Sequence, residues 1–323
     1  MDSERVGDRL QEIATGLYRF DTHYIRQRHT ACYVVVEGGR AAIVDSGVPA
    51  NVPPLLEALA TLEIAPDAVE WVIPTHAHLD HAGGAGHIMP KLPAATLAAH
   101  PSAAPHLINP ERLEAGVRAL YGDEFFDREY APVVPVDAER VVETPDGQEI
   151  KLGERILRVI HTPGHAWHHE SILDTSTGTL IAGDAFGVAY PELIRENEPV
   201  VVPPGPPPQF KPEIYQASID RILELSPSRV ALTHFGVVDD PARVAADLHR
   251  LIDEWVELGR EAGSAEELFQ ALIASCEREL SQRGRSEDQS RFRKLYYWDL
   301  RLSAEGIWTW RQKQEKRSAE GHR

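Results

Sequence analysis

The sequence predicts an α/β protein that ends in a helical extension. Up to residue 240, short β-rich runs alternate with segments of helical spacing, and from residue 241 onward only helical patterns remain. The chain has 323 residues, enough for one large domain with an appendage. We therefore expect a core domain over residues 1–240, a helical extension over 241–312 and a disordered tail over 313–323.

The expected elements follow from the periodicity of the apolar residues. Predicted strands cover residues 16–20, 30–36, 41–44, 70–74, 93–99, 155–161, 170–174, 178–182 and 228–233. Predicted helices cover residues 51–62, 82–89, 110–121, 212–224, 241–260, 264–281 and 288–312. The segment Glu37-Gly38-Gly39-Arg40 is a hairpin signal between two of the strands. A proline-dense loop over residues 202–208 favours stiff extended backbone, as a rigid connector at a pocket rim or as a partner-recognition segment.

Composition counts against several classes of function. The formal net charge of -17 disfavours nucleic acid as a partner, because phosphate backbones attract basic surfaces. No apolar run approaches the ~18 residues of a membrane helix, and the polar first residues do not form a secretion signal. Only Cys32 and Cys276 occur, which favours a reducing, cytoplasmic setting without disulfides. We expect a small-molecule substrate and no membrane partner, and we leave a homodimer open.

One pattern of histidines and aspartates carries the chemistry. Four potential metal ligands stand within six residues, in the run His76-Ala77-His78-Leu79-Asp80-His81. The pattern resumes at Thr162-Pro163-Gly164-His165, Ala182-Gly183-Asp184 and Leu232-Thr233-His234. Four ligands are too many for one tetrahedral ion that also keeps a position open. Imidazole and carboxylate ligands suit zinc, iron or manganese, so the pattern indicates a two-metal hydrolytic site.

This ordered series resembles the metallo-β-lactamase superfamily over about half of the chain. The resemblance implies a four-layer αββα sandwich, which here precedes the C-terminal helical extension. It implies two divalent ions, zinc in the first place with iron or manganese as alternatives. The implied ligands are His76, His78 and His165 for one ion, Asp80, His81 and His234 for the other, and Asp184 as the bridge. Residues 101–138 are then interpreted as an insertion that acts as a lid or as a spectator.

The family contains several chemistries, and the motifs favour hydrolysis of an ester, thioester or lactone. A histidine at position 78 stands where flavodiiron-type redox members carry a carboxylate, and Asp184 stands where zinc β-lactamases usually carry cysteine. The ligand set resembles the glyoxalase II and lactonase branches. The resemblance implies attack of a metal-bridging hydroxide on the carbonyl, with Asp80 orienting it and assisting the leaving group. An iron-dependent persulfide dioxygenase, a phosphodiesterase or nuclease, and a metal-binding scaffold stay open as alternatives.

Four further residues are candidates near this site. His169 follows His165 by four positions, where related sequences often carry a histidine that supports a ligand. An ordinary structural hydrogen bond is the alternative reading of His169. His23 and Tyr24 precede the second predicted strand, and Tyr190 follows Asp184 by six positions. We expect these last three side chains to contact the substrate.

Overall fold

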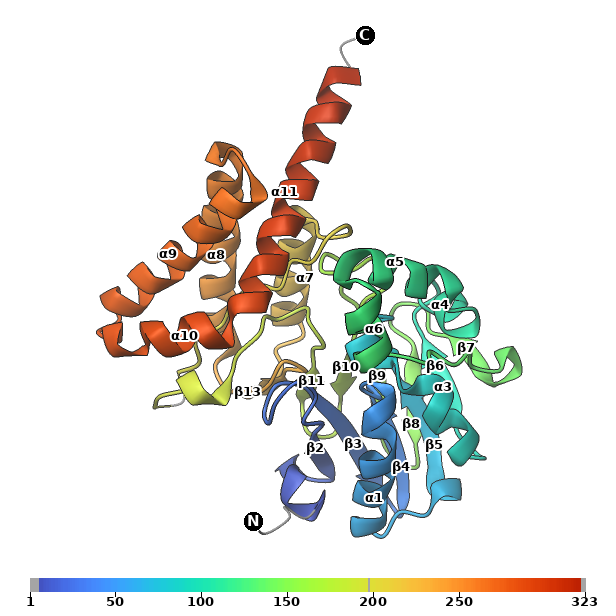
Figure 1. The fold of residues 1–323 in the computed structure, drawn as a ribbon. Coiled ribbons are helices and arrows are strands. Elements are labelled where there is room, and N and C mark those ends of the chain that lie inside the picture. The colour runs from blue at the N-terminus through green and yellow to red at the C-terminus, as the bar shows by residue number, and fades with distance from the viewer. Residues whose placement is uncertain (1–5, 197, 321–323) are drawn as a thin grey trace. The chain divides into compact units, whose positions relative to one another are not determined.

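The computed structural model describes residues 6–196 and 198–320 (Figure 1). These residues form two compact units that interleave along the chain. Within the described residues, the first unit comprises 6–161, 168–183 and 227–237, and the second comprises 162–167, 184–196, 198–226 and 238–320. The sheets lie almost wholly in the first unit, and the long C-terminal helices lie in the second.

The first sheet of the described residues runs in the order β1 to β7. Its strands are β1 (Leu10–Ala14), β2 (Leu17–Asp21), β3 (Ala31–Glu37), β4 (Arg40–Val44), β5 (Val69–Ile73), β6 (Thr96–Ala99) and β7 (Val141–Glu143). The pairs from β1 to β4 are antiparallel, and those from β4 to β7 are parallel. The β3–β4 pair confirms the hairpin predicted at residues 37–40. The parallel strands place the carboxyl ends of β4 and β5 at the same edge of the sheet.

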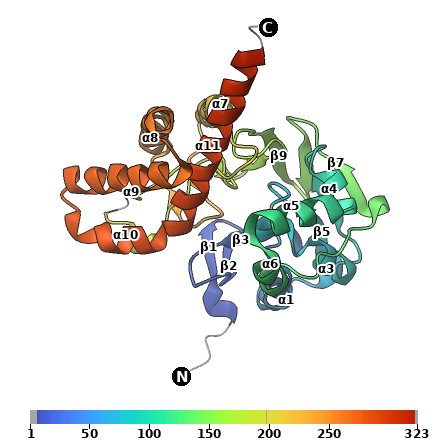
Figure 2. The same ribbon diagram turned by 45° about the horizontal axis from the view of Figure 1, so that its top comes forward.

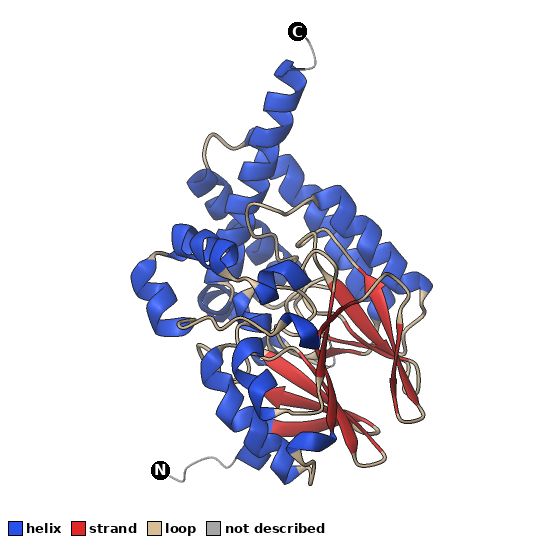
Figure 3. Ribbon diagram, turned by 90° about the vertical axis from the view of Figure 1, so that its right-hand side faces the viewer, coloured by secondary structure: helices blue, strands red, loops and turns tan. Residues whose placement is uncertain are grey.

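The second sheet runs in the order β13, β12, β11, β10, β9, β8. Its strands are β8 (Glu149–Leu152), β9 (Arg155–His161), β10 (Glu170–Asp174), β11 (Thr179–Ile181), β12 (Arg229–Ala231) and β13 (Val237–Val238). Figure 3 shows the strands of both sheets in one view. The β11–β12 pair is parallel, so the segments that follow these two strands leave the sheet at the same edge.

Helices of the first unit cover the first sheet. They are α1 (Val52–Thr61), α2 (Leu79–Ala82), α3 (Ala85–Ile88), α4 (Ala104–Ile108), α5 (Glu111–Tyr121) and α6 (Asp123–Glu129). Leu55 and Leu59 of α1 are buried in one hydrophobic cluster with Ile43 of β4 and Val72 of β5. The predicted insertion at 101–138 contains α4, α5 and α6, so it is more helical than the sequence indicated.

The second unit contains α7 (Pro212–Glu224), α8 (Pro241–Glu261), α9 (Ala265–Gln282), α10 (Gln289–Leu295) and α11 (Tyr297–Glu320) (Figure 2). Side-chain caps start two of these helices: Asp240 accepts from the backbone N–H of Arg243, and Ser264 accepts from that of Glu267. The helix predicted over 288–312 is two helices that meet at Tyr296. With the two sheets, these C-terminal helices confirm the predicted fold class.

The expected disordered tail is not what the structure shows. Helix α11 continues through the polar segment to Glu320, and residues 321–323 of the predicted tail lie outside the described part of the chain. Residues 313–320 contain no apolar residue larger than Ala319, but they include good helix formers, such as Lys316 and Arg317, that extend a helix already begun. No helix among the described residues has the length and apolarity needed to cross a membrane.

Candidate metal site

The metal motif begins where β5 ends. The strand is apolar and mostly buried, and Pro74 stops it, since proline cannot continue the ladder. The chain then turns into the short helix α2, which follows His78 directly. Backbone N–H groups of Ser46 and Gly47, just after β4, donate to the carbonyl of His81 at 2.7 and 3.0 Å. The motif is therefore fixed at both ends by the carboxyl ends of neighbouring parallel strands.

Three predicted ligands come together in the first unit. Asp80, His81 and His234 each offer one ligand atom within 4.8 Å of the others. The Asp80 carboxylate lies 3.3 Å from Nε2 of His234 and 3.7 Å from Nε2 of His81. The side chain of His81 is fully buried, whereas that of Asp80 is 21% exposed. The group is suited to one cation, with its carboxylate on the accessible side.

Asp45, at the end of β4, is a functional residue that the sequence did not identify. Its carboxylate accepts from the backbone N–H of Thr75 at 2.7 Å and from Nδ1 of His81 at 2.9 Å. It also accepts from the hydroxyl of Thr233 at 3.0 Å, one residue before His234. The side chain of Asp45 is 1% exposed. One buried carboxylate therefore forms hydrogen bonds with residues of both the first and the last motif. The signal available in the sequence was an aspartate at the end of an apolar strand.

His76 and His78 also lie close together in the first unit. Their ring centroids are 4.4 Å apart, in an edge-on arrangement. His169, predicted to support a ligand, is fully buried with its ring centroid 4.9 Å from that of His76. His168, which the sequence left without a role, accepts from the backbone N–H of Ala77 at 3.3 Å through Nδ1. His168 and His169 thus both pack against the first motif, so the segment after His165 places two imidazole rings beside it.

The remaining two predicted ligands are a pair in the second unit. Nε2 of His165 lies 3.3 Å from Oδ2 of Asp184, and both side chains are buried. Nδ1 of His165 lies 3.1 Å from the carbonyl oxygen of Pro204. That contact orients Nε2 toward the carboxylate, because a carbonyl only accepts. Since Pro204 belongs to the predicted proline-rich loop, the loop acts here as a rigid support for a candidate ligand.

The loop before β3 carries the predicted substrate residues. His23 has a positive φ of 57° and lies 3.4 Å from the Asp21 carboxylate. Tyr24 is buried, and its hydroxyl donates to that of Tyr130 at 2.8 Å. Burial, with a contribution from the charge of Asp80, raises the pKa of Tyr24. Tyr24 therefore stays protonated beside the candidate site, and Tyr130 ties this loop to the insertion.

His29, on the same loop, lies against the last motif. Its ring centroid is 5.5 Å from that of His234. Burial is the main cause that lowers the pKa of His29 to about 3, and His234 and Arg26 add to it. His29 is therefore neutral across the physiological range and adds no charge to the site.

Tyr190, which we expected to contact the substrate, makes hydrogen bonds with other residues of the second unit. It is fully buried in the second unit, and its hydroxyl donates to the Asp299 carboxylate of α11 at 3.0 Å. Its backbone N–H donates to the hydroxyl of Tyr296 at 3.0 Å. These contacts give Tyr190 a packing role, and its contact with substrate stays a prediction.

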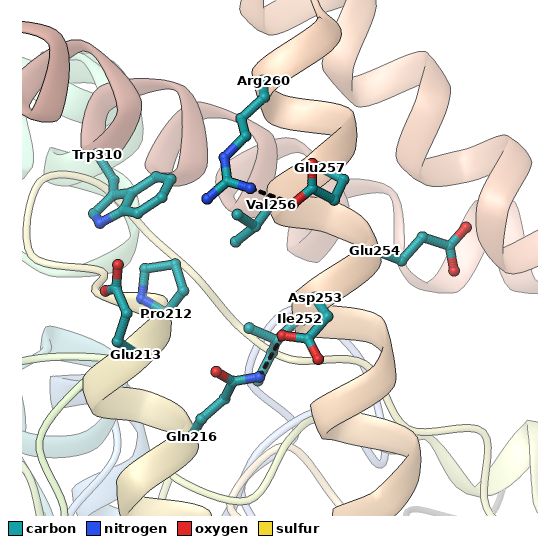
Figure 4. Close-up of a pocket in the computed structure, with 10 residues that line it drawn as sticks. All are labelled: Pro212, Glu213, Gln216, Ile252, Asp253, Glu254, Val256, Glu257, Arg260 and Trp310. Atoms are coloured by element: carbon teal, nitrogen blue, oxygen red, sulfur yellow. Dashed lines mark hydrogen bonds and ion pairs between the residues drawn. The ribbon is translucent and has the colours of Figure 1, made fainter.

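A cavity of about 370 Å³ lies within the second unit, lined by α7, α8 and α11 (Figure 4). Its walls carry several charged side chains and one indole, from Glu213, Asp253, Glu257, Arg260 and Trp310. None of the predicted ligands or substrate residues lines it. The metal ligands in the motifs therefore indicate the chemistry of this chain, and this cavity does not.

The donor set fits a divalent metal. It consists of imidazole nitrogens and carboxylate oxygens, which suit zinc, iron and manganese. The buried imidazole of His81 is hydrogen-bonded through its second nitrogen to a carboxylate, an arrangement that commonly supports a metal-bound histidine. Both cysteines, Cys32 and Cys276, are buried elsewhere in the cores and offer no thiolate. Such a site could activate water and polarise a carbonyl.

Several known proteins are similar to this chain. A family model described as metallo-beta-lactamase superfamily matches residues 25–236. A metallo-beta-lactamase fold-containing protein of Sulfurisphaera tokodaii is 29% identical over 177 residues, 53% of this chain and 62% of the relative. An acyl-coenzyme A thioesterase of Gallus gallus is 26% identical over 185 residues, 53% of this chain and 63% of the relative. The chain therefore spans less than two thirds of the length of either relative. A solved metallo-beta-lactamase family structure from Thermus thermophilus superposes with a TM-score of 0.65 at 21% identity, covering 94% of this chain and 95% of that one.

Proposed function

Because the chain belongs to the metallo-β-lactamase superfamily, we propose that it is a metal-dependent hydrolase of an ester, thioester or lactone. The observation that carries the proposal is the group of Asp80, His81 and His234, with His81 held by the buried carboxylate of Asp45. A histidine oriented in this way presents Nε2 for coordination. The predicted ligands in the other motifs would complete a two-metal centre.

The proposed ligand set divides between two ions. His76, His78 and His165 would hold one ion, and Asp80, His81 and His234 the other. Asp184 would bridge the pair, because a carboxylate has two oxygens. Zinc is the first choice, and iron or manganese would accept the same donors. When bound, such ions would lower the pKa of a shared water and polarise the substrate carbonyl.

The chain's own residues support the reaction in distinct ways. The Asp80 carboxylate is the most exposed of the three side chains in its group, which supports assigning to it the orientation of the attacking water and the transfer of a proton to the leaving group. His81 is fully buried and held by Asp45, so its ring keeps one orientation. The Tyr24 hydroxyl donates to that of Tyr130, so the proton of the Tyr130 hydroxyl is the one that this pair would offer to a substrate oxygen.

Thioesters and related acyl compounds are the proposed substrates. The relative from Gallus gallus is an acyl-coenzyme A thioesterase, and this similarity supports hydrolysis at a carbonyl for the present chain. The net charge of -17 opposes a polyanionic substrate at long range.

The test combines metal analysis with a substrate panel. Purified protein should hold close to two ions per chain and should cleave lactones or thioesters in the metal-loaded form. His76→Ala should abolish this cleavage. One iron per chain with oxygen-consuming activity would favour the dioxygenase alternative. Nuclease activity that His76→Ala removes, with inert lactones and thioesters, would favour the phosphodiesterase alternative.

A further inference from the structure

Helix α7 braces the segment that carries Asp184. Tyr215 of α7 is fully buried, and its hydroxyl donates to the backbone carbonyl of Asp184 at 2.8 Å. The same hydroxyl accepts from the backbone N–H of Gly187 at 3.1 Å. Residues 184–187 contain no helix or strand, so no backbone ladder holds them in place. The tyrosine hydroxyl instead supplies hydrogen bonds to the backbone of this segment, which carries the predicted ligand Asp184.

The same helix also braces the turn that carries His165. A Cβ on Gly164 would lie 2.3 Å from Cα of Tyr215 and 2.4 Å from its backbone nitrogen. Glycine, with a φ of +130° here, is therefore required for the turn to pack directly on the helix backbone. The backbone N–H of Lys211 donates to the carbonyl of Gly164 at 2.9 Å, and the hydroxyl of Ser218 donates to that of Pro163 at 2.6 Å.

We infer that Tyr215 is a positioning residue for the metal centre, acting on His165 and Asp184 together. The inference rests on the proposed function only in taking these two side chains as metal ligands. Their ligand atoms lie 3.3 Å apart, so a small displacement of either loop changes the geometry offered to an ion. Tyr215 touches both loops, one through its hydroxyl and the other through its backbone. Removing the hydroxyl releases the Asp184 loop while leaving the aromatic ring in the core.

The chain offers a matched control for this change. Tyr296 is also fully buried in the second unit, and its hydroxyl donates to the carbonyl of Val200 at 2.8 Å. It accepts from the backbone N–H of Tyr190 at 3.0 Å. The two tyrosines thus make the same pair of backbone contacts, but Tyr296 does so away from the predicted ligands. A loss of stability common to both variants is the cost of removing a buried hydroxyl.

The experiment compares Tyr215→Phe and Tyr296→Phe with the unchanged full-length chain. Zinc affinity is measured by competition with a chromophoric chelator, and the visible spectrum of the cobalt-loaded protein reports the ligand geometry. We expect Tyr215→Phe to weaken metal binding about 10-fold or more and to alter the cobalt spectrum, as loss of a supporting contact commonly does. We expect Tyr296→Phe to match the unchanged chain in both readouts. Equal affinity and identical spectra for all three proteins would overturn the inference.

A second variant keeps the test decisive if Tyr215→Phe does not fold. Ser218→Ala removes the hydroxyl that braces Pro163 and leaves Tyr215 intact. Ser218→Ala should weaken metal binding by a smaller factor than Tyr215→Phe. Unchanged metal affinity would contradict the inference that α7 positions these loops. The readouts also separate this inference from the proposed function. A chain that binds metal in the expected order of affinities but cleaves no ester, thioester or lactone would refute the function and leave the positioning role standing.

Discussion

Nδ1 of His81 donates to Oδ2 of Asp45 across 2.9 Å, and neither side chain is more than 1% exposed. A carboxylate only accepts, so this contact fixes the proton of a neutral His81 on Nδ1. Nε2 is then left as a lone-pair donor on the side of Asp80. The orientation of a predicted ligand is thus set by a residue that stands outside every ligand motif, about 36 positions earlier in the chain.

Asp45→Asn should weaken metal binding by about 10–100-fold, the usual effect of losing a support behind a metal-bound histidine. The amide removes the negative charge and can present an N–H to His81, which disfavours the required tautomer. It also disturbs the hydrogen bonds from Thr75 and Thr233. Chelator competition measures the affinity, and metal content after dialysis gives an independent value.

The control for this change is Asp174→Asn. Asp174 is a fully buried carboxylate of the same unit that pairs with Arg155. Breaking a buried pair costs about 3–5 kcal/mol, so this variant should lose stability with no loss of metal affinity. If Asp45→Asn were destabilised to a similar extent while binding metal like the unchanged chain, Asp45 would be structural only.

Asp184→Ala should impair activity more than His169→Ala. In the proposed centre, Asp184 would contact both ions, so its loss should disturb the whole set of ligands. His169 packs beside His76 at 4.9 Å between ring centroids and is proposed only to support a ligand, so its loss should cost about 10–100-fold. Turnover and metal content are measured for both variants. Comparable values in the two would reverse the proposed roles.

The ligand motifs could be predicted from the sequence because their residues are contiguous or follow strands with clear periodicity. The strand before His76 and the helix over 212–224 were both predicted, the helix with the bounds that α7 has. These elements are fixed by local patterns, in which apolar spacing and proline signals agree. The resemblance then supplied the order of the ligands.

What the sequence could not predict depends on contacts between distant segments. Asp45 joins residues 30, 36 and 188 positions away, and no local pattern marks that role. The brace by Tyr215 likewise joins segments 31 positions apart. Tyr190 looked like a residue beside a ligand loop, yet its partner is Asp299, 109 positions later. Short strands such as β7 and β8 were missed because three or four residues carry too little periodicity.

Truncation after Asp240 should yield insoluble protein. Helix α8 contributes the fully buried Trp255 and Leu248, which would be lost from the core of the second unit. Tyr215 and Ile219 of α7 are also buried in that unit and would be left without much of their surrounding structure. Exposed apolar surface of this kind favours aggregation. Expression in the soluble fraction and size-exclusion chromatography provide the measurement, and a soluble, stable, fully active fragment would show that these helices are dispensable.

The stability of the protein should respond to pH through Glu170. This carboxyl is fully buried, and it accepts from the hydroxyl of Thr144 at 2.7 Å. Burial raises the pKa of Glu170 well above its usual value, and the charge of Asp45 adds to the rise, while the Thr144 hydrogen bond opposes it. The folded state therefore keeps this proton at pH values where the unfolded chain, with a pKa of about 4.3, has released it.

The sign of the effect follows from proton linkage. A raised pKa in the folded state contributes stability that is fully present below the unfolded pKa and is lost as the pH rises through the folded pKa. Glu170→Gln replaces the carboxyl with a neutral group that does not titrate. The unfolding free energy of the variant relative to the unchanged chain should therefore increase steadily as the pH rises above the unfolded pKa of about 4.3. Urea unfolding at several pH values measures it, with Glu154→Gln, at an exposed position between β8 and β9, as the control. A difference that stays constant over this range for Glu170→Gln would mean that the buried carboxyl does not titrate as its surroundings require.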